Sequence, residues 1–181
     1  LDEVYVATDS AEIKNAVESN GGRVIFTSSH HTTGTDRIAE AAKSMNAEII
    51  VNVQGDEPLL DPKHIDQVVG PLLDDPSLQV SALVTKYSVK NSPSDIKAVL
   101  DVNNNIMYCS RADLPGDARM PVTTMWKMSF IIPMRKDFLM QFAAWGPSTW
   151  RGNSAGPITA ATSPSMASRS PATGISSNTG G

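Results

Sequence analysis

The sequence of 181 residues is poor in cysteine, in long apolar runs and in basic residues. Its one cysteine, Cys109, cannot form an internal disulfide, which excludes a disulfide-stapled domain and favours a cytoplasmic location. No apolar run approaches the roughly 18–20 residues of a membrane span, so we expect no membrane insertion. Lys and Arg number 15 against 19 Asp and Glu, and this lack of a basic surplus argues against nucleic-acid binding.

The composition changes near residue 145. All 19 acidic residues lie between Asp2 and Asp137, whereas 28 of the last 36 residues are Gly, Pro, Ser, Thr or Ala. A segment without Leu, Val or Phe cannot bury enough apolar surface to offset its ordering entropy. We therefore predict a folded domain over 1–145 and a low-complexity tail over 146–181. The tail is either a natural disordered segment or the product of translation in a wrong reading frame. Because the chain starts without Met on a strand-like run, we interpret 1–145 as part of a longer domain.

Strand-like and helical patterns alternate over the first 85 residues. Apolar runs at 3–8, 23–26, 47–53 and 78–85 are separated by helical spacing at 11–18, 35–45 and 62–72. This alternation predicts an α/β fold with a mostly parallel sheet and helices on both faces. Further along, runs at 96–102 and 105–109 flank an Asn-Asn turn and predict a β-hairpin subdomain. A strand over 127–132 and an amphipathic helix over 135–145 complete the pattern.

Polar segments follow three of the predicted strands, at 7–9, 27–37 and 54–58. Ligands of open α/β sheets bind outside the carboxyl ends of the strands, so we expect these segments to converge on one crevice. In the second segment, Thr33 and Gly34 precede a helix whose free N–H groups favour an anion or a polar base edge. Routine helix capping by Thr33 and Asp36 is the alternative interpretation.

The third segment holds candidate metal and sugar ligands. Asp56 and Glu57 follow a buried strand, and Mg²⁺ prefers one or two carboxylates together with phosphate oxygens. Turn formation and helix capping are the alternative roles. Gln54 offers both a donor and an acceptor to a base or a sugar. The adjacent His30 and His31 have no Cys or carboxylate at metal spacing, so we interpret them as polar loop residues.

Two longer motifs make the sequence recognisable. The segments His31-Thr32-Thr33-Gly34-Thr35-Asp36-Arg37-Ile38-Ala39-Glu40 and Val51-Asn52-Val53-Gln54-Gly55-Asp56-Glu57-Pro58 together resemble 3-deoxy-manno-octulosonate cytidylyltransferases (CMP-Kdo synthetases). Shorter matches follow in the family's order, namely Val6-Ala7-Thr8-Asp9, Gly21-Gly22, Lys97-Ala98-Val99 and Tyr108-Cys109-Ser110-Arg111-Ala112. The resemblance covers about residues 1–145.

The resemblance implies a Rossmann-like nucleotidyltransferase fold, Mg²⁺ dependence and a homodimer. The implied reaction transfers CMP from CTP to the keto-sugar acid Kdo with release of pyrophosphate, for lipopolysaccharide biosynthesis. By the same resemblance, Thr33, Gly34 and Arg37 bind the nucleotide, and Asp56 is the Mg²⁺ ligand. Gln54 contacts the sugar, and Arg111 faces the sugar carboxylate, for which a bidentate guanidinium is well suited. A surface role in the hairpin is the alternative for Arg111.

The sequence departs from the family pattern in three places. The family's basic N-terminal loop and its second Mg²⁺ carboxylate segment are missing, so we expect the chain by itself to lack transferase activity. Met128 and Ile132 stand where many members carry His and Tyr toward the sugar. A related keto-sugar acid, such as an amino-Kdo or a nonulosonic acid, is therefore the alternative substrate, and a non-catalytic fragment is the alternative from another functional class.

Overall fold

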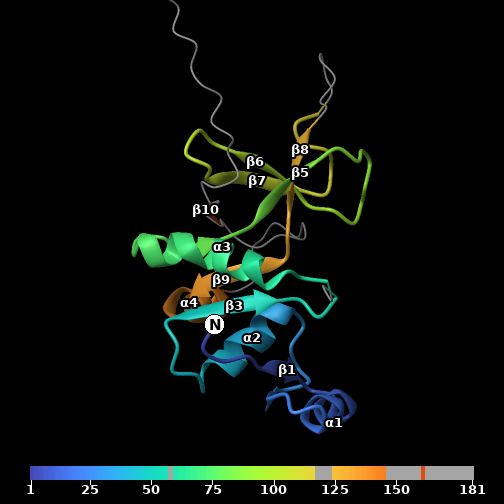
Figure 1. Ribbon diagram of the computed structural model, residues 1–181, viewed down its shortest axis with the longest axis vertical. Helices are drawn as coiled ribbons and strands as arrows, with labels where there is room; N and C mark the ends of the chain where they lie inside the picture. The colour runs from blue at the N-terminus through green and yellow to red at the C-terminus, as the bar shows by residue number, and fades with distance from the viewer. Residues whose placement is uncertain (57–58, 117–123, 146–159, 162–181) are drawn as a thin grey trace, which may run out of the picture.

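The computed structural model describes residues 1–56, 59–116, 124–145 and 160–161, with Figure 1 showing their arrangement. The helices are α1 (Ala11–Ser19), α2 (Gly34–Ala42), α3 (Pro62–Asp74) and α4 (Lys136–Ala144). The strands are β1 (Val6–Thr8), β2 (Val24–Phe26), β3 (Ile49–Val53), β4 (Val80–Ser81), β5 (Val84–Tyr87), β6 (Lys97–Leu100), β7 (Ile106–Ser110), β8 (Met125–Met128), β9 (Ile131–Arg135) and β10 (Ala160–Ala161).

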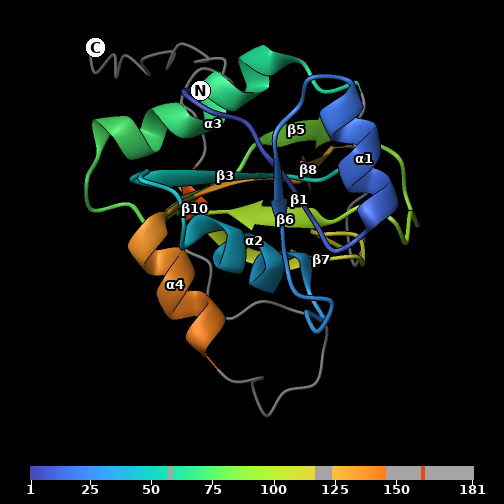
Figure 2. The ribbon, with the colours of Figure 1, turned by 90° about the horizontal axis from the view of Figure 1, so that it is seen from below.

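The first large sheet has the strand order β10-β4-β9-β3 and is covered by helices on both faces, as expected. Successive residues of a strand point to opposite faces. Ile50 of β3 accordingly joins the core formed with α2 and α4, whereas Val51 packs with the residues of α3. Figure 2 shows α3 on one side of β3 and both α2 and α4 on the other.

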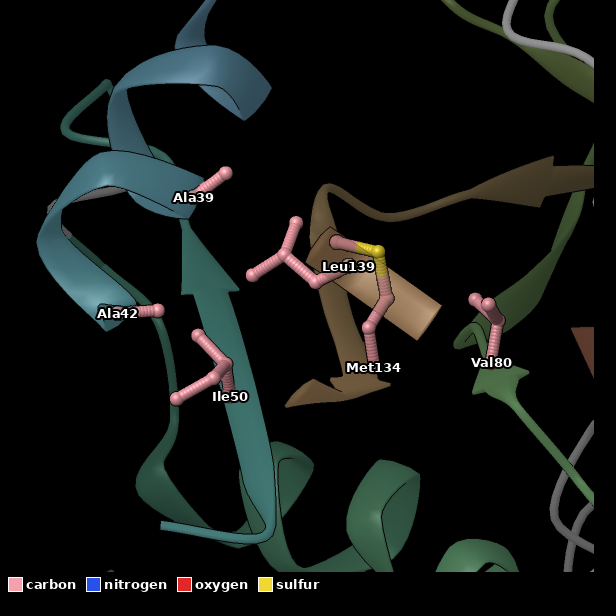
Figure 3. Close-up of a cluster of buried hydrophobic side chains, with 6 residues drawn as sticks. All are labelled: Ala39, Ala42, Ile50, Val80, Met134 and Leu139. Carbon is pink, nitrogen blue, oxygen red and sulfur yellow. The ribbon is translucent and has the colours of Figure 1, made fainter. Parts of the chain in front are cut away.

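The core between this sheet and helices α2 and α4 is built of alanine, branched aliphatic side chains and one methionine. Figure 3 shows its buried members, which are Ala39, Ala42, Ile50, Val80, Met134 and Leu139. Leu139 is fully buried, and burial of such a side chain is worth about 1.5–3 kcal/mol. On the opposite face, the hydroxyl of Ser81 donates to the carbonyl of Val68 at 2.5 Å and so ties β4 to α3.

A second sheet has the order β5-β8-β6-β7, is antiparallel throughout and has its own core. Two stretches of chain run from the first sheet into the second (Figure 1), so the single strands predicted at 78–85 and 127–132 are wrong. Each divides in two, into β4 and β5 and into β8 and β9. At the crossing, the N–H of Ser129 donates to the carbonyl of Leu83 at 2.8 Å. The sequence hid this change of sheet because residues 80–84 are all buried.

The predicted β-hairpin is confirmed as β6 and β7, which pair antiparallel. Asn104 adopts a left-handed φ of 65°, a conformation that asparagine tolerates better than most residues. The carboxylate of Asp101 accepts hydrogen bonds from the backbone N–H groups of Asn103 and Asn105 at 2.8 and 2.7 Å. Local side-chain chemistry therefore specifies this turn.

The mostly parallel sheet is not confirmed in the described residues. There β1 pairs parallel with β2, and β10 parallel with β4, whereas the pairs β3–β9, β4–β9, β5–β8, β6–β7 and β6–β8 are antiparallel. The reason is β9, which returns antiparallel between β3 and β4. The sequence alternation could not reveal an insertion from 50 residues further along the chain.

The predicted boundary between a folded domain and a tail at residue 145 stays a prediction. Most of the tail, 146–159 and 162–181, lies outside the described residues, and its predicted disorder stays a prediction. Within the described part of the chain, no helix has the length and apolar character needed to cross a membrane.

Candidate functional site

The loop that joins β2 to α2 ends in a helix cap. Thr33 is the N-cap of α2, and its hydroxyl accepts from the N–H of Asp36 at 3.2 Å while donating to the Asp36 carboxylate at 2.7 Å. The capping interpretation of these two residues is therefore correct. Gly34 opens the helix, and a Cβ placed there would contact none of the described residues within 4 Å. The first turn of α2 is thus open to a ligand at the end that favours negative charge.

Arg37 joins the ends of three elements. Its Nη1 donates to the hydroxyl of Thr27 at 2.7 Å and to the carbonyl of Ser28 at 3.3 Å, and it pairs with Asp9 at 3.2 Å. Asp9 follows β1 and Thr27 follows β2, so two of the three predicted polar segments do meet at Arg37. The Arg37 side chain is 21% exposed, and its contacts make it part of the scaffold that holds the loop.

A carboxylate further along α2 also holds this loop. Glu40 accepts from the backbone N–H of Ser28 at 3.1 Å, and its other close partner is Nε2 of His31. The hydrogen bond from His31, followed by that from Ser28, keeps the pKa of Glu40 below its ordinary value. The sequence predicted His31 as a polar loop residue and gave it no partner. The sequence signal for a contact between Glu40 and the loop was that Arg37 and Glu40 are three residues apart and share one face of α2.

Gln54 and Asp56 lie in the turn after β3, and both are exposed. Among the described residues, neither side chain makes a hydrogen bond or an ion pair. No group of three or more His, Cys, Asp and Glu side chains gathers at metal-binding distance in that part of the chain. Glu57 lies outside the described residues. Asp56 is therefore an exposed carboxylate that follows β3 and has no hydrogen-bond or ion-pair partner among the described residues.

Arg111 follows β7 in the second sheet. Its Nη1 donates to the carbonyls of Pro93 and Ser94 at 2.9 and 2.8 Å, and the residue is exposed. No hydrogen bond or ion pair connects it with the described residues of the β2–α2 loop or with Asp56. Met128, one of the two departures noted in the sequence, is buried in the core of the second sheet, so it does not face a ligand.

A buried lysine holds the backbone on which Arg111 lies. Lys97 is fully buried, and its Nζ donates to the carbonyls of Ser92, Asp95 and Arg111 at 2.7, 3.0 and 2.5 Å. The carboxylate of Asp113 lies 3.5 Å from the same Nζ. The carboxylate of Asp95 lies 2.6 Å from the ammonium of Lys127 and accepts a hydrogen bond from the hydroxyl of Ser92. These two contacts hold the pKa of Asp95 far below its ordinary value. This network ties residues 92–95 to residues 111–113.

An open pocket lined by Tyr5, Val17, Gly22 and Arg23 lies at the opposite end of β1 from Asp9. It is therefore separate from the candidate site. The predicted site residues consequently fall into three groups, at the β2–α2 loop, after β3 and after β7.

The cytidylyltransferase family profile matches residues 1–159 of the sequence. The chain belongs to this family. Two curated relatives are the 3-deoxy-manno-octulosonate cytidylyltransferases of Pelobacter propionicus and Geobacter sulfurreducens, which are 41% and 39% identical to the chain over 162 and 165 residues. These alignments cover 82% of the chain and 64% and 65% of the relatives. The chain therefore spans a little under two thirds of their length.

Solved structures agree with this cytidylyltransferase membership. The structure of a CMP:2-keto-3-deoxy-manno-octonic acid synthetase complexed with CTP matches at a TM-score of 0.76 and 31% identity, covering 82% of this chain and 63% of that one. HddC from Yersinia pseudotuberculosis matches at a TM-score of 0.56 and 13% identity, covering 84% of this chain and 65% of that one, which shows the fold alone. The resemblance to this family noted in the sequence and the nucleotidyltransferase fold it implied are thereby confirmed.

Proposed function

We propose that the whole protein transfers CMP from CTP to the keto-sugar acid Kdo and releases pyrophosphate, in lipopolysaccharide biosynthesis. The observation that carries the proposal is the likeness, at 31% identity and a TM-score of 0.76, to a synthetase solved with CTP. The names of the curated relatives support the same reaction. In it, a sugar hydroxyl attacks the α-phosphorus in line, an oxygen–phosphorus bond forms, and pyrophosphate leaves with the electrons of the broken bond.

The β2–α2 loop is the proposed nucleotide site. The first turn of α2 presents backbone N–H groups beside Gly34, where no side chain blocks the approach of a base or a phosphate. Thr33 sets the geometry of this turn through its cap. Nη1 of Arg37 contacts Asp9 after β1 and Thr27 after β2. The other N–H groups of Arg37 make no hydrogen bond within the described residues, so we assign them to the nucleotide.

Asp56 is the proposed Mg²⁺ ligand. Asp56 is exposed, and its carboxylate makes no hydrogen bond or ion pair within the described residues, which fits an ion that takes one or two protein carboxylates and fills its other positions with water and phosphate oxygens. When bound, Mg²⁺ would offset negative charge on the triphosphate as pyrophosphate departs. Asp56 itself contributes a fixed negative charge at the end of β3.

Gln54 and Arg111 are the proposed sugar contacts. Gln54 offers an amide donor and acceptor two residues before Asp56. Within the described residues Arg111 donates hydrogen bonds through Nη1 only, so we assign its other N–H groups to a sugar carboxylate. We further infer a cytoplasmic homodimer. The dimer is supported by β7, an edge strand on which Met107 and Tyr108 are 69% and 59% exposed.

The test is pyrophosphate release from CTP by the whole protein, measured with Kdo, an amino-Kdo and a nonulosonic acid in turn. We expect Kdo to give the highest kcat/KM, and preference for either of the other sugars would assign the alternative substrate. Isothermal titration of the chain with CTP tests the nucleotide site separately, and light scattering tests the dimer.

A further inference from the structure

The loop 27–33 is fastened at one residue from two sides. The N–H of Ser28 donates to Glu40 at 3.1 Å, while the carbonyl of the same residue accepts from Nη1 of Arg37 at 3.3 Å. Glu40 and Arg37 lie one helical turn apart on α2, on the face that looks back at the loop. Ser28 is therefore clamped between an anion and a cation that the same helix supplies.

The far end of the loop is held by the same carboxylate. Nε2 of His31 contacts Oε2 of Glu40, so one side chain spans the loop from its second residue to its fifth. His31 keeps 20% of its side chain exposed and Glu40 keeps 35%. Thr33, which caps α2, and Gly34, which opens it, follow His31 by two and three residues. The position of the open helix turn thus depends on a contact that does not touch it.

Both carboxylate oxygens of Glu40 are already engaged by the loop. Both oxygens of Glu40 accept from the N–H of Ser28, at 3.3 and 3.1 Å, and one of them also faces the His31 ring. A group occupied in this way acts on a ligand through the loop that it shapes. A loop held in its bound conformation before the ligand arrives avoids the entropy of ordering on binding.

We propose that Glu40 and His31 are positioning residues that hold the loop 27–33 in the conformation that accepts CTP. This inference rests on the proposed function, because it assigns CTP to the loop. The pair contacts no substrate. Its removal frees the N–H of Ser28 and the ring of His31, while the Thr33 cap and the contacts of Arg37 with Asp9 and the Ser28 carbonyl remain. Affinity for CTP therefore falls although the residues next to the ligand are unchanged.

The first experiment compares Glu40→Ala with Glu12→Ala. Glu12 is an exposed glutamate in α1 that makes no hydrogen bond with other described residues, so it is a matched control. We expect Kd for CTP, from isothermal titration, to rise about tenfold in Glu40→Ala and to stay unchanged in Glu12→Ala. Amide hydrogen exchange should accelerate in 27–33 and not in β3. Unchanged exchange in the loop, or unchanged Kd with faster exchange, would overturn the proposal.

The second experiment uses the chemistry of the contact. Gln at position 31 places an amide N–H near the place of Nε2, whereas Leu has no donor. We expect His31→Gln to keep most of the CTP affinity and His31→Leu to lose about as much as Glu40→Ala. Equal affinity of the two variants would show that only the bulk at position 31 matters and would refute the positioning role.

The two proposals fail in distinguishable ways. If the wild-type chain binds no CTP, the proposed nucleotide site fails, and with it the positioning role. If the wild type binds CTP and Glu40→Ala binds it equally well, the nucleotide site stands and only the positioning role falls. A general loss of stability is separated from both by measuring the melting temperature of each variant and titrating CTP well below it.

Discussion

Replacing Lys97 by methionine removes the charge at the centre of the second sheet's loop network. The side chain is fully buried, and its ammonium donates to three backbone carbonyls, those of Ser92, Asp95 and Arg111. Asp113 lies 3.5 Å away. Methionine has nearly the same length but no donor, so the change leaves the three carbonyls and the carboxylate without their shared partner.

The magnitude follows from these contacts. A buried acceptor that loses its donor costs about 1–3 kcal/mol, and removing one member of a buried ion pair costs about 3–5 kcal/mol. The loss is reduced because the buried ammonium, with its own desolvation penalty, is also gone. We therefore expect the free energy of unfolding to fall by about 3 kcal/mol. For a chain of this size, that lowers the melting temperature by roughly 6–12 °C.

The assay is thermal and urea unfolding followed by circular dichroism. The matched control is Lys86→Met, because Lys86 lies on strand β5 of the same sheet and is exposed. We expect the control to change stability by less than about 0.5 kcal/mol. If Lys97→Met were as stable as Lys86→Met, the reasoning that this ammonium organises residues 92–95 and 111–113 would be wrong.

Three further predictions follow from other parts of the molecule. Asp56→Ala in the whole protein should abolish Mg²⁺-dependent pyrophosphate release without changing the melting temperature, since the carboxylate is exposed; near-normal turnover at saturating Mg²⁺ would remove Asp56 from the metal role. Leu139→Ala should cost about 2–5 kcal/mol in urea unfolding because the side chain is fully buried, whereas Leu73→Ala, at a side chain 68% exposed, should cost little. Glu40, whose folded-state pKa lies below its ordinary 4.5, contributes stability above that pH, and the contribution is lost as the pH falls through the folded-state pKa. The difference in urea midpoint between wild type and Glu40→Gln should therefore shrink as the pH is lowered from 6 toward 3, and a constant difference would contradict the assignment.

The local elements could be read from the sequence with good agreement. Helix α2 begins at Gly34 behind the Thr33 cap, and the hairpin turns at Asn103 and Asn104, as the residue types predicted. These features are determined by contacts a few residues apart, such as the cap and the Asp101 side chain, so they are present in the sequence itself. The strand pairing could not be predicted from the sequence, because an apolar run indicates that a strand is buried but not which strand lies beside it.

For the candidate site too, some features could be predicted from the sequence and others required the fold. The motifs around Thr33 and Asp56 identified the family and the residues that belong to it. How those residues are used required the fold: Arg37 is largely committed to Asp9 and Thr27, and His31 is bonded to Glu40. Side-chain partners nine to 28 residues apart are chosen by where the strands and helices come to lie, which no local pattern records.

By itself, the sequence determined the family, the helices with their caps, the hairpin and the polar segments that follow the strands. Only the tertiary structure decided that β9 returns antiparallel between β3 and β4, and that two stretches of chain pass from one sheet into the other. It also decided that Lys97 is buried and donates to backbone carbonyls. The physical reason is how far apart in the sequence the interacting residues lie. Caps and turns are stabilised by neighbours in the chain, whereas strand order and buried charge depend on which distant surfaces are brought together to exclude water.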